Sequence, residues 1–172
     1  DRIVSGGQNG VDQAALRAAR GLGIATGGRA PRGWMTLDGP APWLADYGLV
    51  EHARPGYPPR TEANVRDSDA TLRLAADFES PGELCTLRMI DRHKKPRADV
   101  FLAVDHIHGG YHVTAVVVDG AQRSDARSRE ALVAWCRRYR VINVAGNSER
   151  TALGIGAAAE VLLRDLFAEA LR

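Results

Sequence analysis

The chain has 172 residues, of which 45% are hydrophobic and 26% are charged, and its formal net charge is +2. This length suits one domain, and no apolar run approaches the roughly 18 residues that a membrane span needs. The slight positive charge lacks the strong basic bias of nucleic-acid-binding proteins, so we expect no membrane and no nucleic acid as partner, and an anionic small molecule instead.

The first third of the chain predicts a strand, a glycine-rich loop and a helix. Residues 2–5 are β-rich, and from Val11 the apolar residues recur at helical spacing until Gly21. No charged and apolar leader precedes this strand, which favours a cytoplasmic location. A second strand is expected over 24–26. Residues 27–60 have many glycines, prolines and aromatics but no clear period, which indicates a long functional loop at a ligand site or a subunit contact.

The rest of the chain alternates strands and helices. We expect strands over 70–75, 100–104, 113–118 and 141–145, and helices over 61–67, 83–93, 124–139 and from 151 or 156 to 171. Thr61 is the expected N-cap of the first of these helices, and residues 80–82 are an expected turn. The alternation predicts an α/β sheet, with a possible antiparallel hairpin near 100–118.

The loop between the first strand and the first helix is the leading candidate for a ligand site. It reads Ser5-Gly6-Gly7-Gln8-Asn9-Gly10-Val11-Asp12. Glycines let backbone N–H groups approach an anion, and the helix N-terminus points at the same place, which favours phosphate. The pattern is neither a Walker loop nor G-x-G-x-x-G, and a plain connecting turn is the alternative. Asp12 is expected to complement the helix dipole, or to orient Gln8 or a ligand hydroxyl.

Two further segments suit the walls of such a site. Residues 27–34 carry Arg29 and Arg32 beside glycines and a tryptophan, a set suited to a phosphate and a ring. Residues 60–69 place polar groups just before a buried strand. A solvated loop and an ordinary surface helix are the respective alternatives.

Histidines and cysteines give weaker signals. His106 and His108 would share a face of a strand and could hold a metal with His112, but histidines at a hairpin tip need no ligand and no carboxylate pattern accompanies them, so we assign no metal. Cys85 and Cys136 exclude a disulfide framework and a C-x-x-C motif, and both are expected to be reduced. No base is placed beside Ser5, so no catalytic residue is assigned.

Four motifs in the same order resemble the putative molybdenum carrier family. They are residues 5–12, the Gly-Gly-x-x-Pro-Arg-Gly pattern at 27–33, Asn64-Val65-Arg66-Asp67-Ser68-Asp69, and Asn143-Val144-Ala145-Gly146. That family is similar to the algal molybdenum-cofactor carrier protein and to the lysine-decarboxylase-like (Lonely-guy) Rossmann proteins. The resemblance spans nearly the whole chain. It implies a Rossmann-like, mostly parallel sheet with helices on both faces, forming one ligand-binding domain over residues 1–172. It also implies a phosphorylated nucleotide- or pterin-like ligand, such as the molybdenum cofactor, and a homo-oligomer.

The loop and the resemblance together give a set of expected binding residues. Ser5, Gly6, Gly7, Gln8, Asn9, Gly10 and Asp12 would hold a phosphate, and Arg29 and Arg32 would neutralise it. Asn64, Arg66, Asp67 and Asp69 would select the remainder of the ligand, and Gly82 with Thr86 would form a second phosphate-facing turn.

Departures from the family favour binding over catalysis. Asn9 stands where the family has threonine. Of the family's Gly-Gly-Thr turn, the segment 80–88 keeps only Gly82 and Thr86. Glu83 beside a helix N-terminus would repel a phosphate unless it turns away, and Arg88 falls where phosphoribohydrolase relatives place a glutamate for glycosidic cleavage.

Two other functions remain open at this stage. One is a nucleotide N-glycosidase, in which Glu62 or Asp67 would place a water molecule. The other is a structural assembly subunit, whose melting temperature would not respond to any ligand.

Overall fold

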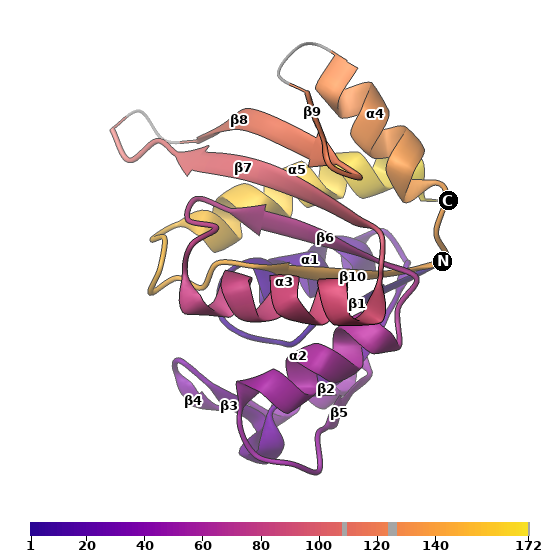
Figure 1. Ribbon diagram of the computed structural model, residues 1–172. Helices are drawn as coiled ribbons and strands as arrows, with labels where there is room; N and C mark the ends of the chain where they lie inside the picture. Colours follow the sequence, from indigo (N-terminus) through magenta and orange to yellow (C-terminus); the bar gives the residue numbers. More distant parts are fainter. Residues whose placement is uncertain (108–109, 124–126, 172) are drawn as a thin grey trace.

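The computed structural model describes residues 1–107, 110–123 and 127–171. Its main sheet has eight strands, in the order β5-β2-β1-β10-β6-β7-β8-β9 (Figure 1). These strands are β1 (Arg2–Val4), β2 (Ala25–Ala30), β5 (Leu49–Glu51), β6 (Ala70–Ala75), β7 (Arg97–Val104), β8 (Tyr111–Val118), β9 (Ala121–Arg123) and β10 (Val141–Gly146). Strands from β5 to β7 pair in parallel, and β8 and β9 are antiparallel to their neighbours. The expected mostly parallel α/β sheet and the antiparallel hairpin near 100–118 are both confirmed.

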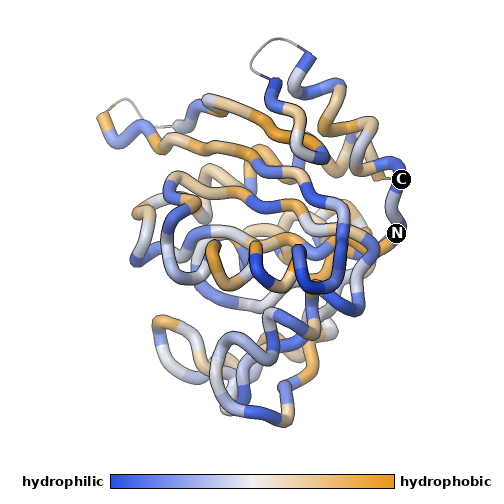
Figure 2. The backbone as a smooth tube through the Cα atoms, in the orientation of Figure 1, coloured by the Kyte–Doolittle hydropathy of each residue, from blue (hydrophilic) through white to orange (hydrophobic). Residues whose placement is uncertain are grey.

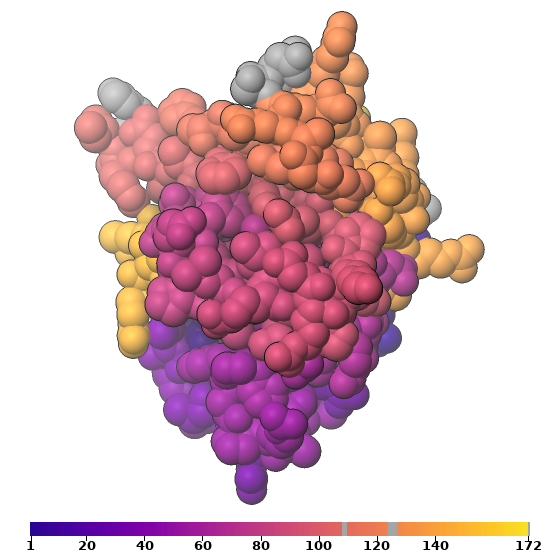
Figure 3. Space-filling model, viewed as in Figure 1, coloured from indigo at the N-terminus to yellow at the C-terminus, as the bar shows by residue number. Residues whose placement is uncertain are grey.

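Helices cover both faces of this sheet, as expected for a Rossmann-like fold. The helices are α1 (Val11–Gly21), α2 (Tyr57–Arg66), α3 (Pro81–His93), α4 (Arg127–Cys136) and α5 (Ile155–Ala170). In Figure 1, α2 and α3 lie in front of the sheet, and α1 and α5 lie behind it. The face seen in Figure 3 is accordingly covered largely by residues of α2 and α3, in purple and magenta. No helix in the described ranges is long and apolar enough to cross a membrane.

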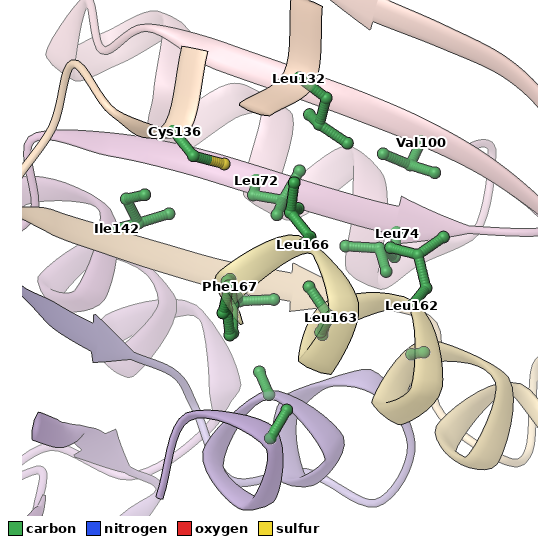
Figure 4. Close-up of a cluster of buried hydrophobic side chains, with 14 of the residues drawn as sticks. Leu72, Leu74, Val100, Leu132, Cys136, Ile142, Leu162, Leu163, Leu166 and Phe167 are labelled. Carbon is green, nitrogen blue, oxygen red and sulfur yellow. The ribbon is translucent and has the colours of Figure 1, made fainter. Parts of the chain in front are cut away.

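The main hydrophobic core lies between the sheet and α5. Strand β6 is buried along its whole length, and its leucines and alanines suit a strand covered on both faces; its one charged residue, Arg73, is paired with buried carboxyl groups. Figure 2 shows the hydrophobic stretches of β7 and β8 in orange. Leucines of β6 meet Leu163, Leu166 and Phe167 of α5, with Cys136 of α4 close by (Figure 4). Burial raises the pKa of the Cys136 thiol to about 12, and both cysteines are free.

The prediction that residues 27–60 lack regular structure is wrong. This segment contains the end of β2, two 3₁₀ turns (Arg32–Trp34 and Pro42–Tyr47), the two-stranded hairpin β3 (Met35–Thr36) and β4 (Gly39–Pro40), and β5. Each piece is too short to show a period in the sequence. Leu44 and Leu49 of this segment pack on Leu16 of α1 in a second, smaller core, which holds the segment against the sheet.

Two helix starts also differ from expectation. Helix α2 begins at Tyr57 after Gly56, not after Thr61, because two prolines occupy its first turn, where no backbone N–H is needed. Helix α3 begins at Pro81 with Ser80 as N-cap, so residues 80–82 form a helix start rather than a turn. The first three residues of the helix expected over 124–139 lie outside the described residues.

Candidate functional site

A cleft of about 620 Å³ lies at the carboxyl ends of β1, β6 and β10. The chain passes from β1 to β2 on one side and later from β6 to β7 on the other, so the connections diverge here. Open α/β sheets bind ligands at such a switch point. The cleft is lined by Gln8, Asp12, Thr36, Leu37, Tyr57, Pro58, Arg60, Thr61, Asn64, Ser80, Pro81, Gly82, Glu83, Cys85, Thr86, Arg88, Asn143, Ala145, Gly146, Asn147, Ser148, Arg150 and Thr151.

A buried ion pair stands at the base of the loop over residues 5–12. Arg60 Nη1 of α2 donates to Asp12 Oδ2 of α1 across 3.2 Å, and the two side chains are only 11% and 5% exposed. A Cβ on Gly6 would lie 1.4 Å from Arg60 Nη1, so the guanidinium covers this glycine directly. Burial raises the pKa of the Asp12 carboxyl, and Arg60 opposes that rise.

Arg60 is a residue that the sequence prediction missed. It was expected to precede α2, yet it lies in the first turn of that helix and faces the loop. Its Nε atom is buried and has no hydrogen-bond partner among the residues that the structure describes. Only its place at the start of the polar segment 60–69 indicated its involvement.

Most of the loop's other groups are bound within the protein. Ser5 Oγ donates to the Val144 carbonyl across 2.8 Å. The Gln8 N–H donates to Asp12 Oδ2 (3.2 Å), and the Val11 N–H donates to the Asn147 carbonyl (3.2 Å). Two glycines of the loop are also in close contact with protein atoms. A Cβ on Gly7 would lie 2.7 Å from Leu44 Cδ1, and one on Gly10 would lie 2.5 Å from the Asn147 carbonyl oxygen.

The side chains of Gln8 and Asn9 fasten the β3–β4 hairpin to this loop. The Leu37 N–H lies 2.9 Å from Gln8 Oε1 and 3.0 Å from Asn9 Oδ1. Asn9 Nδ2 donates to Asp38 Oδ2 across 2.6 Å. The hairpin thus forms a wall of the cleft. Asn9 holds the hairpin in place and does not itself line the cleft.

The start of α3 faces the cleft without a side-chain cap. Ser80 Oγ donates instead to the Asp77 carbonyl (3.1 Å) and accepts from Asn147 Nδ2 (3.2 Å). A Cβ on Gly82 would meet nothing within 4 Å, so space is open beside this turn. Thr86 Oγ1 donates to the Gly82 carbonyl (3.0 Å), which stiffens the same turn. Uncapped N–H groups at a helix start attract anions.

Glu83 lies buried in the same helical turn. It is 2% exposed, and its Oε2 lies 3.6 Å from Arg73 Nη1, which is itself next to Asp99. Burial raises the pKa of Glu83 to about 8, although Arg73 opposes the shift. The side chain is therefore mostly protonated at neutral pH, and the repulsion of phosphate considered from the sequence is largely removed.

The structure places some of the predicted binding residues at this cleft and others elsewhere. Gln8, Asp12, Asn64, Gly82 and Thr86 line the cleft, with the rest of the loop directly behind it. Arg29, Asn64 and Asp67 line a different cleft, which also includes Arg2. Arg32 is exposed on the first 3₁₀ turn.

Three of the separated residues have identifiable structural contacts. Arg66 forms a two-point ion pair with Asp67 on the surface, at 2.7 and 3.0 Å. Asp69 Oδ2 accepts the N–H groups of Arg140 and Val141 at the start of β10. Strand alternation turns the Arg29 side chain away from the loop, toward the second cleft.

Glu62 and Asp67, the candidates for placing a catalytic water, do not line the cleft. Glu62 accepts from Arg92 (3.2 Å) and lies 3.1 Å from His93 Nε2 on α3. Hydrogen bonds from His93 and Arg92 lower the pKa of Glu62. Both contacts fasten α2 to α3.

The histidine segment gives no metal centre in the part of the chain that is described. His112 Nε2 lies 3.7 Å from Asp105 Oδ2, and both His106 and His112 are exposed. His108 lies outside the described residues. Within those residues, no group of three histidine, cysteine or acidic side chains is placed to hold a metal ion.

Both a family model and a solved structure match this chain over nearly its whole length. A family model described as the circularly permutated YpsA SLOG family matches residues 3–167. A crystal structure from Syntrophus aciditrophicus SB, of a protein named as a putative molybdenum carrier protein, matches with a TM-score of 0.72 and 28% sequence identity. That match covers 99% of this chain and 94% of the other. No significant match was found among curated proteins.

Proposed function

The chain belongs to the circularly permutated YpsA SLOG family, a molybdenum carrier-like family, and we propose that it binds a phosphorylated nucleotide- or pterin-like molecule in the cleft at the carboxyl ends of β1, β6 and β10. The proposal includes a single ligand-binding domain over residues 1–172. The similar solved structure is named as a molybdenum carrier protein, so the molybdenum cofactor is the ligand that we propose for this chain.

One observation carries the proposal: Arg60 and the uncapped start of α3 line the same cleft. Asp12 fixes the Arg60 guanidinium in front of Gly6, so little side-chain freedom is lost when a phosphate arrives. A phosphate there would accept from Arg60 and from backbone N–H groups in the first turn of α3. The loop over residues 5–12 acts mainly by positioning Arg60 and the hairpin.

The residues of the cleft fit a phosphorylated ring system such as the molybdenum cofactor. The volume of about 620 Å³ lies within the usual range for small-molecule sites. Arg60, Arg88 and Arg150 supply positive charge for the phosphate, and Tyr57, which is 45% exposed, offers a ring face at the rim. When bound, the cofactor would bring its metal held by its own sulfur atoms. We therefore propose that the protein recognises the phosphate and the ring of the cofactor, and not its metal.

Binding is favoured over N-glycosidase activity because neither Glu62 nor Asp67 lines the cleft. Incubation with nucleoside monophosphates, followed by chromatography, tests this preference. Release of free base that is lost in Glu62→Gln or Asp67→Asn variants would contradict it.

A homo-oligomer is also part of the proposal. Met35, Trp43 and Val50 are all about half exposed; Val50 lies on the edge strand β5, and the other two lie on the segment that precedes it. Apolar side chains next to an unpaired strand edge suit contact with a second copy. Analytical ultracentrifugation of the wild type and a Trp43→Ser variant tests this.

Two measurements test the binding proposal directly. Native mass spectrometry of freshly purified protein, with elemental analysis for molybdenum, identifies any bound molecule. Calorimetric titration with guanosine monophosphate compares the wild type with Arg60→Gln, which we expect to bind about tenfold or more weakly. A protein that carries no ligand, and whose melting temperature does not respond to any phosphorylated compound, would instead be a structural subunit.

A further inference from the structure

A second cleft, of about 240 Å³, opens between α2 and the strands β1 and β2. It reaches toward the start of β1 and β10, since Arg2 and Val141 line it, whereas the first cleft lies at the carboxyl ends of the strands. Arg29 and Asp67 line its walls, and Gly28 and Gly48 contribute surface without side chains.

The guanidinium groups of Arg2 and Arg29 in this cleft have no carboxylate partner among the described residues. Arg2 covers Gly27: a Cβ there would lie 3.2 Å from both Nε and Nη2 of Arg2. Among the described residues, the hydrogen bond of its Nε goes to a backbone carbonyl, that of Thr26, across 3.4 Å. The Arg29 guanidinium has no hydrogen bond or ion pair within the described ranges of the chain.

The nearby acids are engaged elsewhere. Both oxygens of Asp67 are taken by Arg66, and Arg29 acts on Asp67 only at longer range. Asp69 Oδ2 accepts two backbone N–H groups at the start of β10. Within the described ranges, neither Arg2 nor Arg29 has an ion pair of its own, and the one carboxylate that lines the cleft, Asp67, is paired with Arg66.

The position of Arg29 is fixed by its backbone. Asn64 Oδ1 accepts the Arg29 N–H (2.7 Å), and Asn64 Nδ2 donates to the Arg29 carbonyl (3.2 Å). Because residues two apart in a strand share a face, the Arg29 side chain projects from the same face of β2 as Gly27, which Arg2 covers.

We propose that Arg2 and Arg29 form a second anion site, which takes the phosphate group of a small molecule and is separate from the cleft at the carboxyl ends of the strands. Each of the two guanidinium groups can give two parallel hydrogen bonds to a tetrahedral oxyanion. Glycine at 27 lets Arg2 lie close to the strand, and Gly28 and Gly48 present only backbone atoms to the cleft.

Titration with inorganic phosphate at constant ionic strength tests the site, with the arginine Nε–Hε signals and backbone amides followed by NMR. We expect saturable shifts at Arg2, Arg29 and Asn64, weakened about tenfold in Arg29→Gln and in Arg2→Gln. Arg140→Gln removes a nearby exposed charge that does not line the cleft, and it should behave as the wild type. Arg60→Gln should keep these shifts while losing those at α3, which separates this site from the proposed function.

The proposal is overturned if phosphate shifts only signals of the first cleft, or none. It is equally overturned if Arg29→Gln and Arg2→Gln both bind as the wild type does, or if Arg140→Gln weakens binding as much as they do. Unchanged dispersion of the other amide signals shows that each variant is folded.

Discussion

Arg60 Nη1 lies 3.2 Å from Asp12 Oδ2, and both side chains are almost fully buried. The pair joins α2 to α1 across the front of Gly6, so a single contact ties two helices and the loop together. Because each charge is removed from water, each depends on the other for its stability.

Replacing Arg60 by glutamine should destabilise the protein by about 3 kcal/mol, since it leaves a buried carboxylate without its cation. Urea unfolding at neutral pH measures this loss. The deficit should shrink in acid, because burial raises the pKa of Asp12 and protonation then removes the unpaired charge. Arg17→Gln is the control: its pair with Glu160 is 41% and 25% exposed and should contribute under about 1 kcal/mol. Equal losses of unfolding free energy in the two variants would show that the buried pair contributes no more to stability than an exposed one.

Gly6→Ala should reduce phosphate affinity about tenfold, because its Cβ would lie 1.4 Å from Arg60 Nη1 and must displace the guanidinium. Calorimetry with guanosine monophosphate gives the affinity. Gly21→Ala, at the end of α1 with nothing within 4 Å of a Cβ, should leave it unchanged. Unaltered binding by Gly6→Ala would mean that Arg60 does not contact the ligand. A change at Gly7 would act differently, since its side chain would run into Leu44 of the smaller core.

Glu83→Gln should flatten the dependence of stability on pH. The pKa of Glu83 is about 8 in the folded protein, above its ordinary value of 4.5. The folded state thus holds the proton more tightly, so its stabilisation is complete below pH 4.5 and is lost as the pH rises toward 8. The wild type should lose unfolding free energy over this interval, and Glu83→Gln should lose less. Asp12 contributes in the same direction in both proteins, but its charge also raises the pKa of Glu83, so the difference between the profiles reports the coupled pair. Parallel profiles would show that Glu83 is ionised throughout.

The sequence was sufficient for the elements that pack extensively on the main core. Strands β6 and β10 and helix α5 carry apolar patterns that follow from contact with one continuous core, and their positions were predicted closely. Residues 27–60 were not, because strands of two or three residues show no period and are held by distant partners such as Leu16. Arg60 was missed for a related reason: its role comes from a contact with Asp12, 48 positions away in the chain.

Motif order also grouped residues that the fold separates. Arg29 belongs to the next motif after the loop in the sequence, but strand alternation directs its side chain to the cleft that Asp67 also lines. Asn64 was expected to contact the ligand. It lines both clefts, and its amide is already bound to the backbone of β2.

Asn64→Ala should destabilise the protein by about 2 kcal/mol, because it leaves two backbone groups of β2 without partners. Strand β1 ends at Val4, opposite Gly27, so β2 continues without a neighbour on that side. The Asn64 amide replaces the missing strand by binding both the N–H and the carbonyl of Arg29. Asn64→Asp keeps the acceptor for the N–H but loses the donor to the carbonyl, and it adds a buried charge, so it should not restore stability.

Hydrogen exchange distinguishes this role from a general loss of packing. In Asn64→Ala the Arg29 amide should exchange faster relative to that of Leu72 in the central strand β6, whereas a global effect would accelerate both equally. Arg66→Gln, on the exposed face of the same helix, should change neither amide and should cost under about 1 kcal/mol. Should the Arg29 amide keep its protection in Asn64→Ala, another group must satisfy β2 at this point, and the fixed position of Arg29 in the second cleft would need a different cause.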